Sequence, residues 1–150
     1  MSTVPGCPLC DAAGGRLVVQ GAKWRLVHAQ EAGFPAFYRV VWQDHVREFS
    51  QLPRADRIAC LDVVTAVEEA MLRHLQPAKV NLATLGNVVP HVHWHVIARF
   101  DWDSHFPAPV WAAPLRPAPA AELARIVAAR AAMERDLAAR LALLESVPGN

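Results

Sequence analysis

The chain has 150 residues, of which 53% are hydrophobic and only 19% are charged. This balance excludes an intrinsically disordered chain and supplies enough apolar surface for one compact domain over residues 1–150. Lys and Arg number 15 against 14 Asp and Glu, so the formal charge of +1 provides no broad basic face for duplex nucleic acid or an anionic membrane. The longest stretch without these charged residues, 80–98, contains Asn, Gly, Pro and His and is not a membrane span.

The cysteine content bears on the cellular compartment. There are three cysteines, an odd number, and the first residues show neither the basic segment nor the apolar segment of a secretory signal. This combination favours a reducing compartment in which thiols bind metal or stay buried. We therefore expect a cytoplasmic protein.

Three short β-type runs follow a turn-rich segment at residues 5–10. Residues 16–20 and 24–28 flank a Gly-Ala-Lys link, which predicts a hairpin. Residues 37–42 are rich in aromatic and β-branched side chains, which favours a central strand.

A helix is predicted between Pro53 and Pro77, because proline is tolerated where a helix begins and ends a helix farther along. Its apolar side chains recur near helical spacing, so one face should cover the sheet. These side chains are Ile58, Leu61, Val64, Met71, Leu72 and Leu75. Residues 79–84 then form a strand candidate, and a Gly-Asn turn separates them from a last strand at residues 91–99.

The C-terminal third contains a proline-rich loop and a long helix. Five prolines within residues 101–120 predict a semi-extended loop, and residues 121–146 predict an amphipathic helix. The apolar stripe of this helix consists of Leu123, Val127, Leu137, Leu141 and Leu144. The elements together predict an α+β fold: an antiparallel sheet of about five strands with one covering helix and a long C-terminal helix. Its core spans about residues 7–111, and residues 112–120 form a proline-rich connection.

Histidine alternates with apolar residues in the last predicted strand. Alternate side chains of a strand share a face, so His91, His93 and His95 should project together. Val92, Trp94 and Val96 should point into the core. A row of three imidazoles is costly as core filling, because each ring carries polar nitrogens that need partners. We therefore interpret the row as functional.

The run His-Val-His-Trp-His-Val-Ile at residues 91–97 resembles the signature of the histidine triad (HIT) family, in which three histidines alternate with apolar residues. The resemblance extends from Cys7 to about Trp111 and includes a Cys-x-x-Cys pair, a hairpin, a strand ending in His and a helix. It implies a HIT-like fold and a hydrolase or transferase that acts at the α-phosphate of a nucleotide. His93 would be the nucleophile, and His95 would contact the phosphate or orient His93.

This implied chemistry suits an imidazole side chain. Neutral His is nucleophilic near pH 7, and a phosphorus–nitrogen bond is labile enough for water to cleave. His93 would form a nucleotidyl-histidine, and water would then release a nucleoside monophosphate. A backbone carbonyl that accepts the proton of the other ring nitrogen would hold His93 in the reactive tautomer.

The charge that develops on the phosphoryl oxygens needs hydrogen-bond donors. Asn87 and Arg99 are the candidates for substrate binding. Asn87 stands where relatives usually carry Gln, but it is equally a turn former. Arg99 is equally a surface cation at a strand end. His105, in the loop after the triad, is placed to fold over the site.

The chain departs from the family pattern at several positions. Val88 replaces a Ser or Thr that contacts phosphate in many relatives. Residues 41–45 read Val-Trp-Gln-Asp-His and lack the usual Pro and Lys, while an upstream His of some relatives falls near Phe37. The substrate preference of relatives is therefore not transferred to this chain.

Cys7 and Cys10 have the two-residue spacing that lets two thiolates bind one tetrahedral metal. A redox pair or two idle thiols are the alternatives, but a position near the terminus among Pro and Gly disfavours redox use. A closed zinc site needs two further ligands, and His45 and His91 are the candidates. The resemblance to zinc-bearing relatives implies that these two complete a Cys-Cys-His-His site. Such a zinc ion would be structural, because no coordination position remains for substrate.

The leading hypothesis is a zinc-stabilised nucleotide hydrolase that cleaves a phosphoanhydride or phosphoramidate bond, with dinucleoside polyphosphates as expected substrates. A nucleotidyltransferase uses similar residues but is usually much larger. The alternative from another class is a nucleotide-binding or zinc-stabilised interaction module with little turnover. The resemblance also implies a homodimer, and the C-terminal helix either serves that contact or packs on its own sheet.

Overall fold

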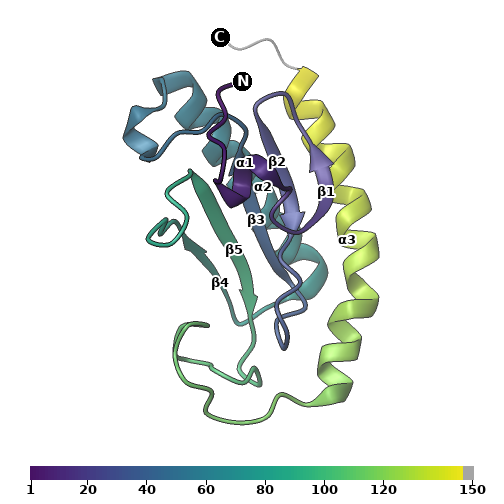
Figure 1. Cartoon of the computed structure of the whole chain (residues 1–150). Helices are drawn as coiled ribbons and strands as arrows, with labels where there is room; N and C mark the ends of the chain where they lie inside the picture. Colours follow the sequence, from purple (N-terminus) through teal and green to yellow (C-terminus); the bar gives the residue numbers. More distant parts are fainter. Residues whose placement is uncertain (147–150) are drawn as a thin grey trace.

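The computed structural model describes residues 1–146, which form a five-stranded antiparallel sheet with two long helices (Figure 1). The strand order is β1-β2-β3-β5-β4. The strands are β1 (Arg16–Gln20), β2 (Trp24–His28), β3 (Phe37–Trp42), β4 (Lys79–Ala83) and β5 (His93–Arg99). The helices are α1 (Pro8–Asp11), the 3₁₀ turn η1 (Phe49–Gln51), α2 (Arg54–Leu75) and α3 (Ala120–Ser146). This architecture confirms the predicted α+β fold.

The last strand begins two residues later than the histidine pattern predicts. Pro90 has no N–H to donate, and the N–H of His91 donates to the carbonyl of Val89 (2.8 Å), which makes a tight turn. The N–H of Val92 donates to the carbonyl of Val46 (2.7 Å), outside the sheet. His91 is therefore turned out of the strand, and regular pairing with β3 starts at His93.

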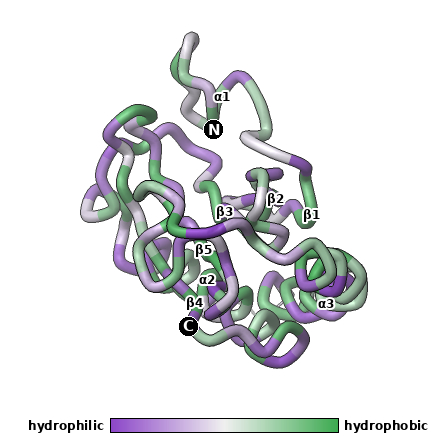
Figure 2. The backbone as a smooth tube through the Cα atoms, turned by 90° about the horizontal axis from the view of Figure 1, so that it is seen from below, coloured by the Kyte–Doolittle hydropathy of each residue, from purple (hydrophilic) through white to green (hydrophobic). Residues whose placement is uncertain are grey.

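The main core lies between one face of the sheet and the two long helices. Alternate residues of the inner strands face this core, among them Leu26, Tyr38, Val40, Trp42, Val96 and Ala98. Figure 2 looks from below and shows α2 and α3 on one side of the strands and α1 on the other. The core face and the opposite face are thus separate, and the histidines of β5 lie on the opposite face.

The buried stripes of the two helices agree only in part with the predicted ones. In α2, Val64, Met71 and Leu75 are buried as predicted, whereas Ile58, Leu61 and Leu72 are between 40% and 49% exposed. The helix also buries Cys60, Val63, Ala66, Val67 and Ala70. Alanine side chains fit on the buried face of α2 because this helix packs closely against both the sheet and α3. In α3 the buried residues are Ile126, Met133, Leu137 and Leu141. Val127 and Leu144 remain exposed. No helix within residues 1–146 combines the length and apolar composition needed to cross a bilayer.

A polar cluster also holds α3 to the sheet. Glu134 of α3 accepts hydrogen bonds from the Tyr38 hydroxyl (2.7 Å) and from Arg16 (2.6 Å). Burial alone would raise the pKa of Glu134, but these two donors outweigh burial and hold the pKa below its usual range. The C-terminal helix therefore packs on its own sheet, which is one of the two alternatives left open by the sequence.

The N-terminal segment is fixed over the opposite face of the sheet by Arg25. This buried side chain of β2 donates to the carbonyls of Leu9 (2.6 Å), Ala12 (3.2 Å) and Ala13 (3.0 Å). The carbonyls of Leu9 and Ala12 are among those that a short helix leaves without intrahelical partners, and Ala13 follows the helix. The contact positions α1 above β2 and β3, next to the histidines.

We expect the docking of α3 on α2 to contribute measurably to stability. Leu137→Ala should lower the free energy of unfolding by about 2–5 kcal/mol, because it removes a fully buried side chain from the core. Leu143→Ala is the matched control on the same helix, and its 69% exposure predicts a change within about 0.5 kcal/mol. Urea unfolding followed by circular dichroism measures both. Equal, small effects would show that α3 does not pack as described.

Candidate metal centre and histidine site

Cys7, Cys10, His45 and His91 meet at one point beside the sheet. Cys7 caps the N-terminus of α1, and the N–H of Cys10 donates to its carbonyl (2.9 Å), so both sulfur atoms are presented by one short turn. His45 follows β3 and His91 precedes β5, and these two strands are neighbours in the sheet. Residues far apart in the sequence are thus joined because β3 and β5 pair.

The distances between the four ligand atoms fit a tetrahedral zinc ion. These atoms all lie within 4.8 Å of one another. The sulfur of Cys10 lies 3.4 Å from Nδ1 of His45 and 3.5 Å from Nδ1 of His91, and the sulfur of Cys7 lies 3.5 Å from the same His91 atom. A tetrahedron with Zn–S bonds of about 2.3 Å and Zn–N bonds of about 2.0 Å has sulfur-to-nitrogen edges of about 3.5 Å.

The orientation of His91 also suits a metal ligand. Its Nε2 lies 2.7 Å from the carbonyl oxygen of Trp42, so Nε2 carries the proton and Nδ1 presents a lone pair toward the two sulfur atoms. The side chain is 1% exposed. The four residues are therefore positioned to hold a structural zinc ion, and two thiolates with two imidazoles leave no open coordination position.

His93 is oriented by the backbone of the same strand. Its Nδ1 lies 2.6 Å from the carbonyl oxygen of His91. Because a carbonyl only accepts, Nδ1 carries the proton and Nε2 keeps a free lone pair. Burial lowers the pKa of His93, the hydrogen bond to His91 acts in the opposite sense, and the charge of Arg39 adds to the lowering. The ring is therefore held neutral.

His95 lies beside His93 in a mostly aromatic environment. Its ring centroid is 4.9 Å from that of His93, 5.5 Å from Phe37 and 5.3 Å from Trp111. Burial, together with the nearby His93 and the positive charge of Arg39, lowers the pKa of His95 to about 4. Its Nδ1 is buried and has no hydrogen-bond partner among the described residues.

Arg39 is a neighbour of the site that the sequence analysis missed. It pairs directly with His95 across β3 and β5, so both side chains lie on the same face of the sheet. Its guanidinium donates to the carbonyl of Gly14 (2.9 Å) and to Glu31 (3.1 Å), and it remains 21% exposed. The register between β3 and β5 would have revealed it, but alternation within one strand does not fix that register.

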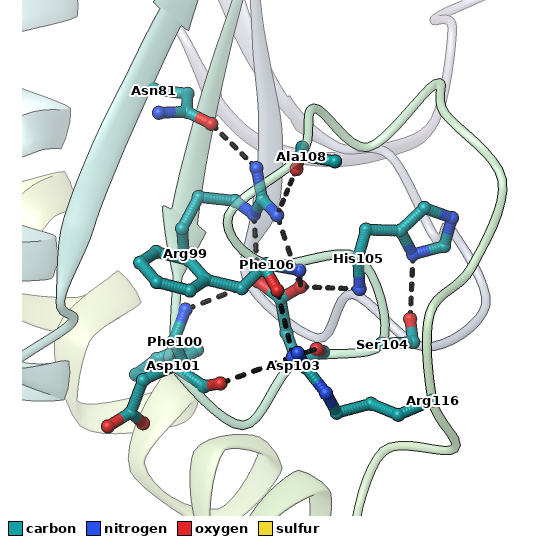
Figure 3. A network of polar contacts seen from close by, with 10 residues as sticks. All are labelled: Asn81, Arg99, Phe100, Asp101, Asp103, Ser104, His105, Phe106, Ala108 and Arg116. Carbon is teal, nitrogen blue, oxygen red and sulfur yellow. Dashed lines mark hydrogen bonds and ion pairs between the residues drawn. The ribbon is translucent and has the colours of Figure 1, made fainter.

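Arg99 corrects an expectation, because it does not offer its charge to a substrate. It is 2% exposed, and its nitrogens donate to Asp103 (2.8 and 3.1 Å), Asn81 (2.8 Å) and the carbonyl of Ala108 (2.8 Å) (Figure 3). Asp103 is equally buried and forms the charged partner. Arg99 at the end of β5 and Asp103 four residues later thus form a buried ion pair, and this pair holds the loop after β5 in place.

The other two predicted binding residues lie at the two ends of β5. Asn87 is exposed in the loop between β4 and β5. His105 is half-buried in the loop after β5, with its Nδ1 2.8 Å from the Ser104 hydroxyl and its ring 5.1 Å from that of Phe34. The structure therefore joins the four metal ligands and joins His93 to His95, whereas His105 packs against Phe34.

The chain matches one protein family model and is similar to several solved structures. The family model of the HIT domain matches residues 14–102, more than half of the chain. A histidine triad protein of Marinobacter aquaeolei is 26% identical, with a TM-score of 0.65 over 83% of this chain and 92% of that one. A search of curated proteins found no match.

Two further solved structures show the same fold at lower identity. A histidine triad protein of Sinorhizobium meliloti is 22% identical, with a TM-score of 0.69 over 91% of this chain and 96% of that one. A Zn-bound histidine triad family protein of Mycobacterium smegmatis is 16% identical, with a TM-score of 0.57 over 87% and 97%. The similarity of fold thus extends beyond the residues that the family model matches.

We expect the purified protein to contain about one zinc ion per chain, and Cys7→Ser to lose it. Because zinc ties the N-terminal segment to the sheet, the variant should also unfold at a temperature lower by about 5 °C or more. Mass spectrometry of the metal and a thermal melt measure the two effects. Cys60→Ala is the control, since this buried thiol of α2 lies outside the metal cluster and its loss should leave the zinc content unchanged. Metal-free wild-type protein with an unchanged melt would contradict the assignment.

The ion pair of Arg99 and Asp103 predicts a loss of stability in acid. Burial alone would raise the pKa of Asp103, but hydrogen bonds from Arg99 and from the N–H groups of His105 and Phe100 hold it below its usual value. In the unfolded chain the pKa of an aspartate is about 3.9, and above that pH the ionised Asp103 contributes its full stabilisation of the fold. This contribution is lost as the pH falls through the lower pKa that Asp103 has in the folded protein.

Asp103→Asn should lower the free energy of unfolding at pH 7 by about 3–5 kcal/mol, because a buried guanidinium loses its charged partner. The variant should also lose the part of the acid sensitivity below about pH 4 that Asp103 contributes. Urea unfolding between pH 3 and pH 7 measures both. Asp101→Asn, with an exposed side chain in the same loop, should match the wild type; a similar loss in both variants would rule out a specific role of the pair.

Proposed function

Because the chain belongs to the HIT domain family, we propose that it is a nucleotide hydrolase that attacks the α-phosphate of a phosphoanhydride or phosphoramidate. The nucleophile is His93, and dinucleoside polyphosphates are the expected substrate class. His95 contacts the phosphate or orients His93.

The observation that carries the proposal is the hydrogen bond from Nδ1 of His93 to the carbonyl of His91, at 2.6 Å. It fixes the proton on Nδ1, so the lone pair of Nε2 is free to attack phosphorus without the help of a general base. Burial keeps the ring neutral by lowering its pKa. Both properties are what a nucleophilic imidazole requires near pH 7.

The reaction proceeds in two displacements. Nε2 of His93 forms a bond to the α-phosphorus while the bond from phosphorus to the leaving oxygen or nitrogen breaks, and the leaving group takes that electron pair and a proton from solvent. Water then attacks the same phosphorus, the phosphorus–nitrogen bond breaks, and the proton lost by water passes to solvent. The products are a nucleoside monophosphate and the released leaving group, and His93 returns to its neutral state.

The charge on the phosphoryl oxygens requires donors near His93 and His95. Arg39 supports this role because it lies on the same face, directly opposite His95, and part of its guanidinium is exposed. Asn87 in the preceding loop remains a proposed phosphate ligand, and His105 a more distant one. Arg99 is not included, since its donors are already bonded within the chain.

The metal centre is proposed to serve the site without taking part in the reaction. A relative from Mycobacterium smegmatis is described as Zn-bound, which agrees with the donor set of this chain. Zinc supplies only rigidity here, because all four positions are filled by protein ligands. His91 binds through Nδ1 while its carbonyl orients His93, so the same residue links both features. A homodimer also remains a proposal.

A nucleotide-binding module with little turnover is the second candidate. It is favoured by Val88, an apolar side chain that is 93% exposed in the loop where a hydroxyl would contact phosphate. The two candidates differ in one respect: a hydrolase needs Nε2 of His93 for bond formation, whereas a binding module uses it at most as a ligand contact.

The test is a hydrolysis time course over dinucleoside polyphosphates and adenosine 5′-phosphoramidate, with wild type beside His93→Ala. We expect nucleoside monophosphate from the wild type and a rate lower by at least about 10³-fold in the variant, because the attacking atom is gone. His74→Ala is the matched control, since His74 pairs with Asp136 on the helical side of the sheet. Chromatography resolves the products.

Two results would contradict the proposal, the first at the role of His93 and the second at the hydrolase activity. One is equal turnover by wild type and His93→Ala, which would exclude His93 as the nucleophile. The other is nucleotide binding by both proteins without turnover of any substrate in the panel, which would favour the binding module. A nucleotidyl group trapped on wild type by acid-free quenching and absent from His93→Ala would support the covalent step directly.

A further inference from the structure

Trp111 is a large side chain that stays on the surface although it contacts the histidine site. It is 54% exposed, and its ring lies 5.3 Å from that of His95 with the two planes at 69°. One part of the indole is thus fixed against the imidazole while much of its surface remains free. An exposed indole next to a buried polar site is suited to stack on a flat ring of a ligand.

The loop that carries Trp111 is held in place by buried polar groups. Asp103 accepts hydrogen bonds from Arg99 and from the N–H groups of His105 (2.9 Å) and Phe106 (2.7 Å) (Figure 3). Arg116, farther along the loop, donates to the carbonyls of Asp103 (3.0 Å) and Phe106 (2.8 Å). The loop is therefore bonded to itself on both sides of Trp111, and the indole is positioned before a ligand arrives.

Apolar packing adds a second anchor directly beside the indole. Val110 packs against a small cluster formed by Phe34, Phe37 and Ile97. Phe37 in turn lies with its edge toward His95, at 5.5 Å. Trp111 is thus the exposed member of an aromatic group next to His95, and Phe37 of β3 is its buried member.

The other end of the histidine face is already covered by the chain itself. Cys7 and Leu9 of the N-terminal segment pack there on Val27 and Val41. A nucleotide whose phosphate lies at His93 and His95 therefore cannot extend toward the metal centre. The nucleoside is therefore placed on the side of Trp111, the exposed aromatic residue that contacts His95.

We propose that Trp111 stacks on the nucleobase of the bound nucleotide and thereby determines affinity for nucleosides over other phosphate esters. This inference rests on the proposed function, because it takes the phosphate to lie at His93 and His95. Stacking uses the face of the base and not its hydrogen-bonding edge, so the contact favours any nucleobase over none and discriminates little between bases.

The experiment compares two probes that differ only in the base: AMP and ribose 5-phosphate. Isothermal titration calorimetry measures their affinities for the zinc-loaded wild type and for Trp111→Ala. We expect Trp111→Ala to weaken AMP binding by about 5- to 150-fold, the range measured when an aromatic residue that stacks on a base is removed. Binding of ribose 5-phosphate should change by less than about twofold.

Two further variants separate stacking from the integrity of the loop. Leu115→Ala truncates another exposed apolar side chain of the same loop, and its AMP affinity should match the wild type. Trp111→Phe keeps an aromatic face and should retain most of the affinity. It should also lose the change in tryptophan fluorescence that AMP produces in the wild type, because the emitting ring in contact with the base is gone.

The possible failures are distinguishable. If the wild type binds AMP and Trp111→Ala binds it equally well, the role of Trp111 is overturned and the proposed function stands. If Trp111→Ala weakens AMP and ribose 5-phosphate by the same factor, Trp111 supports the phosphate site and does not stack on a base. If the wild type turns over the substrate panel but does not bind AMP, the inference alone is overturned. If it neither turns over the panel nor binds AMP, both the inference and the proposed function are overturned.

Discussion

The hydrogen bond between Nδ1 of His93 and the carbonyl of His91 is the interaction on which the site depends. It sets the tautomer of the proposed nucleophile, and it does so through the residue whose own ring faces the metal centre. His91 is fixed twice, by its Nε2 donating to Trp42 and by its Nδ1 directed at two sulfur atoms. A shift of His91 would therefore move the acceptor that holds His93, so the position of the His93 ring depends on the candidate metal centre.

Two buried arginines fix the two segments that border this unit. Arg25 bonds to the carbonyls at the end of α1 and holds the cysteine turn over the sheet, while Arg99 pairs with Asp103 and holds the loop after β5. Neither guanidinium is available to a substrate, because both are nearly fully buried and bonded. Arg39 differs from both: it lies between the two bordering segments, bonds to an exposed carboxylate and keeps part of its surface open. The buried arginines thus hold segments of the fold in place, whereas the partly exposed Arg39 has surface left for a ligand.

The sequence predicts the elements well, because the alternation of the strands and the proline limits of the helix between residues 53 and 77 are local properties. It also identifies the four candidate metal ligands: Cys7 and Cys10 by their spacing, and the two histidines through the resemblance to zinc-bearing relatives. It fails where the outcome depends on what packs nearby. Ile58 and Leu72 satisfy the helical period but face solvent, since α3 approaches α2 from another side. Arg99 looks like a free cation until Asp103, four residues later, folds back onto it.

Arg39 and Trp111 show why a site cannot be read from its motif alone. The triad motif contains its histidines in one short strand, but the surroundings of those histidines come from pairing and from a loop. Arg39 reaches the site only through the register that sets it opposite His95, and Trp111 only through a loop whose path is set by a buried ion pair. In the proposed function, Arg39 faces the charge of the phosphate and Trp111 faces the base. The surroundings of the histidines are therefore set by residues outside the motif, through strand register and through a buried ion pair.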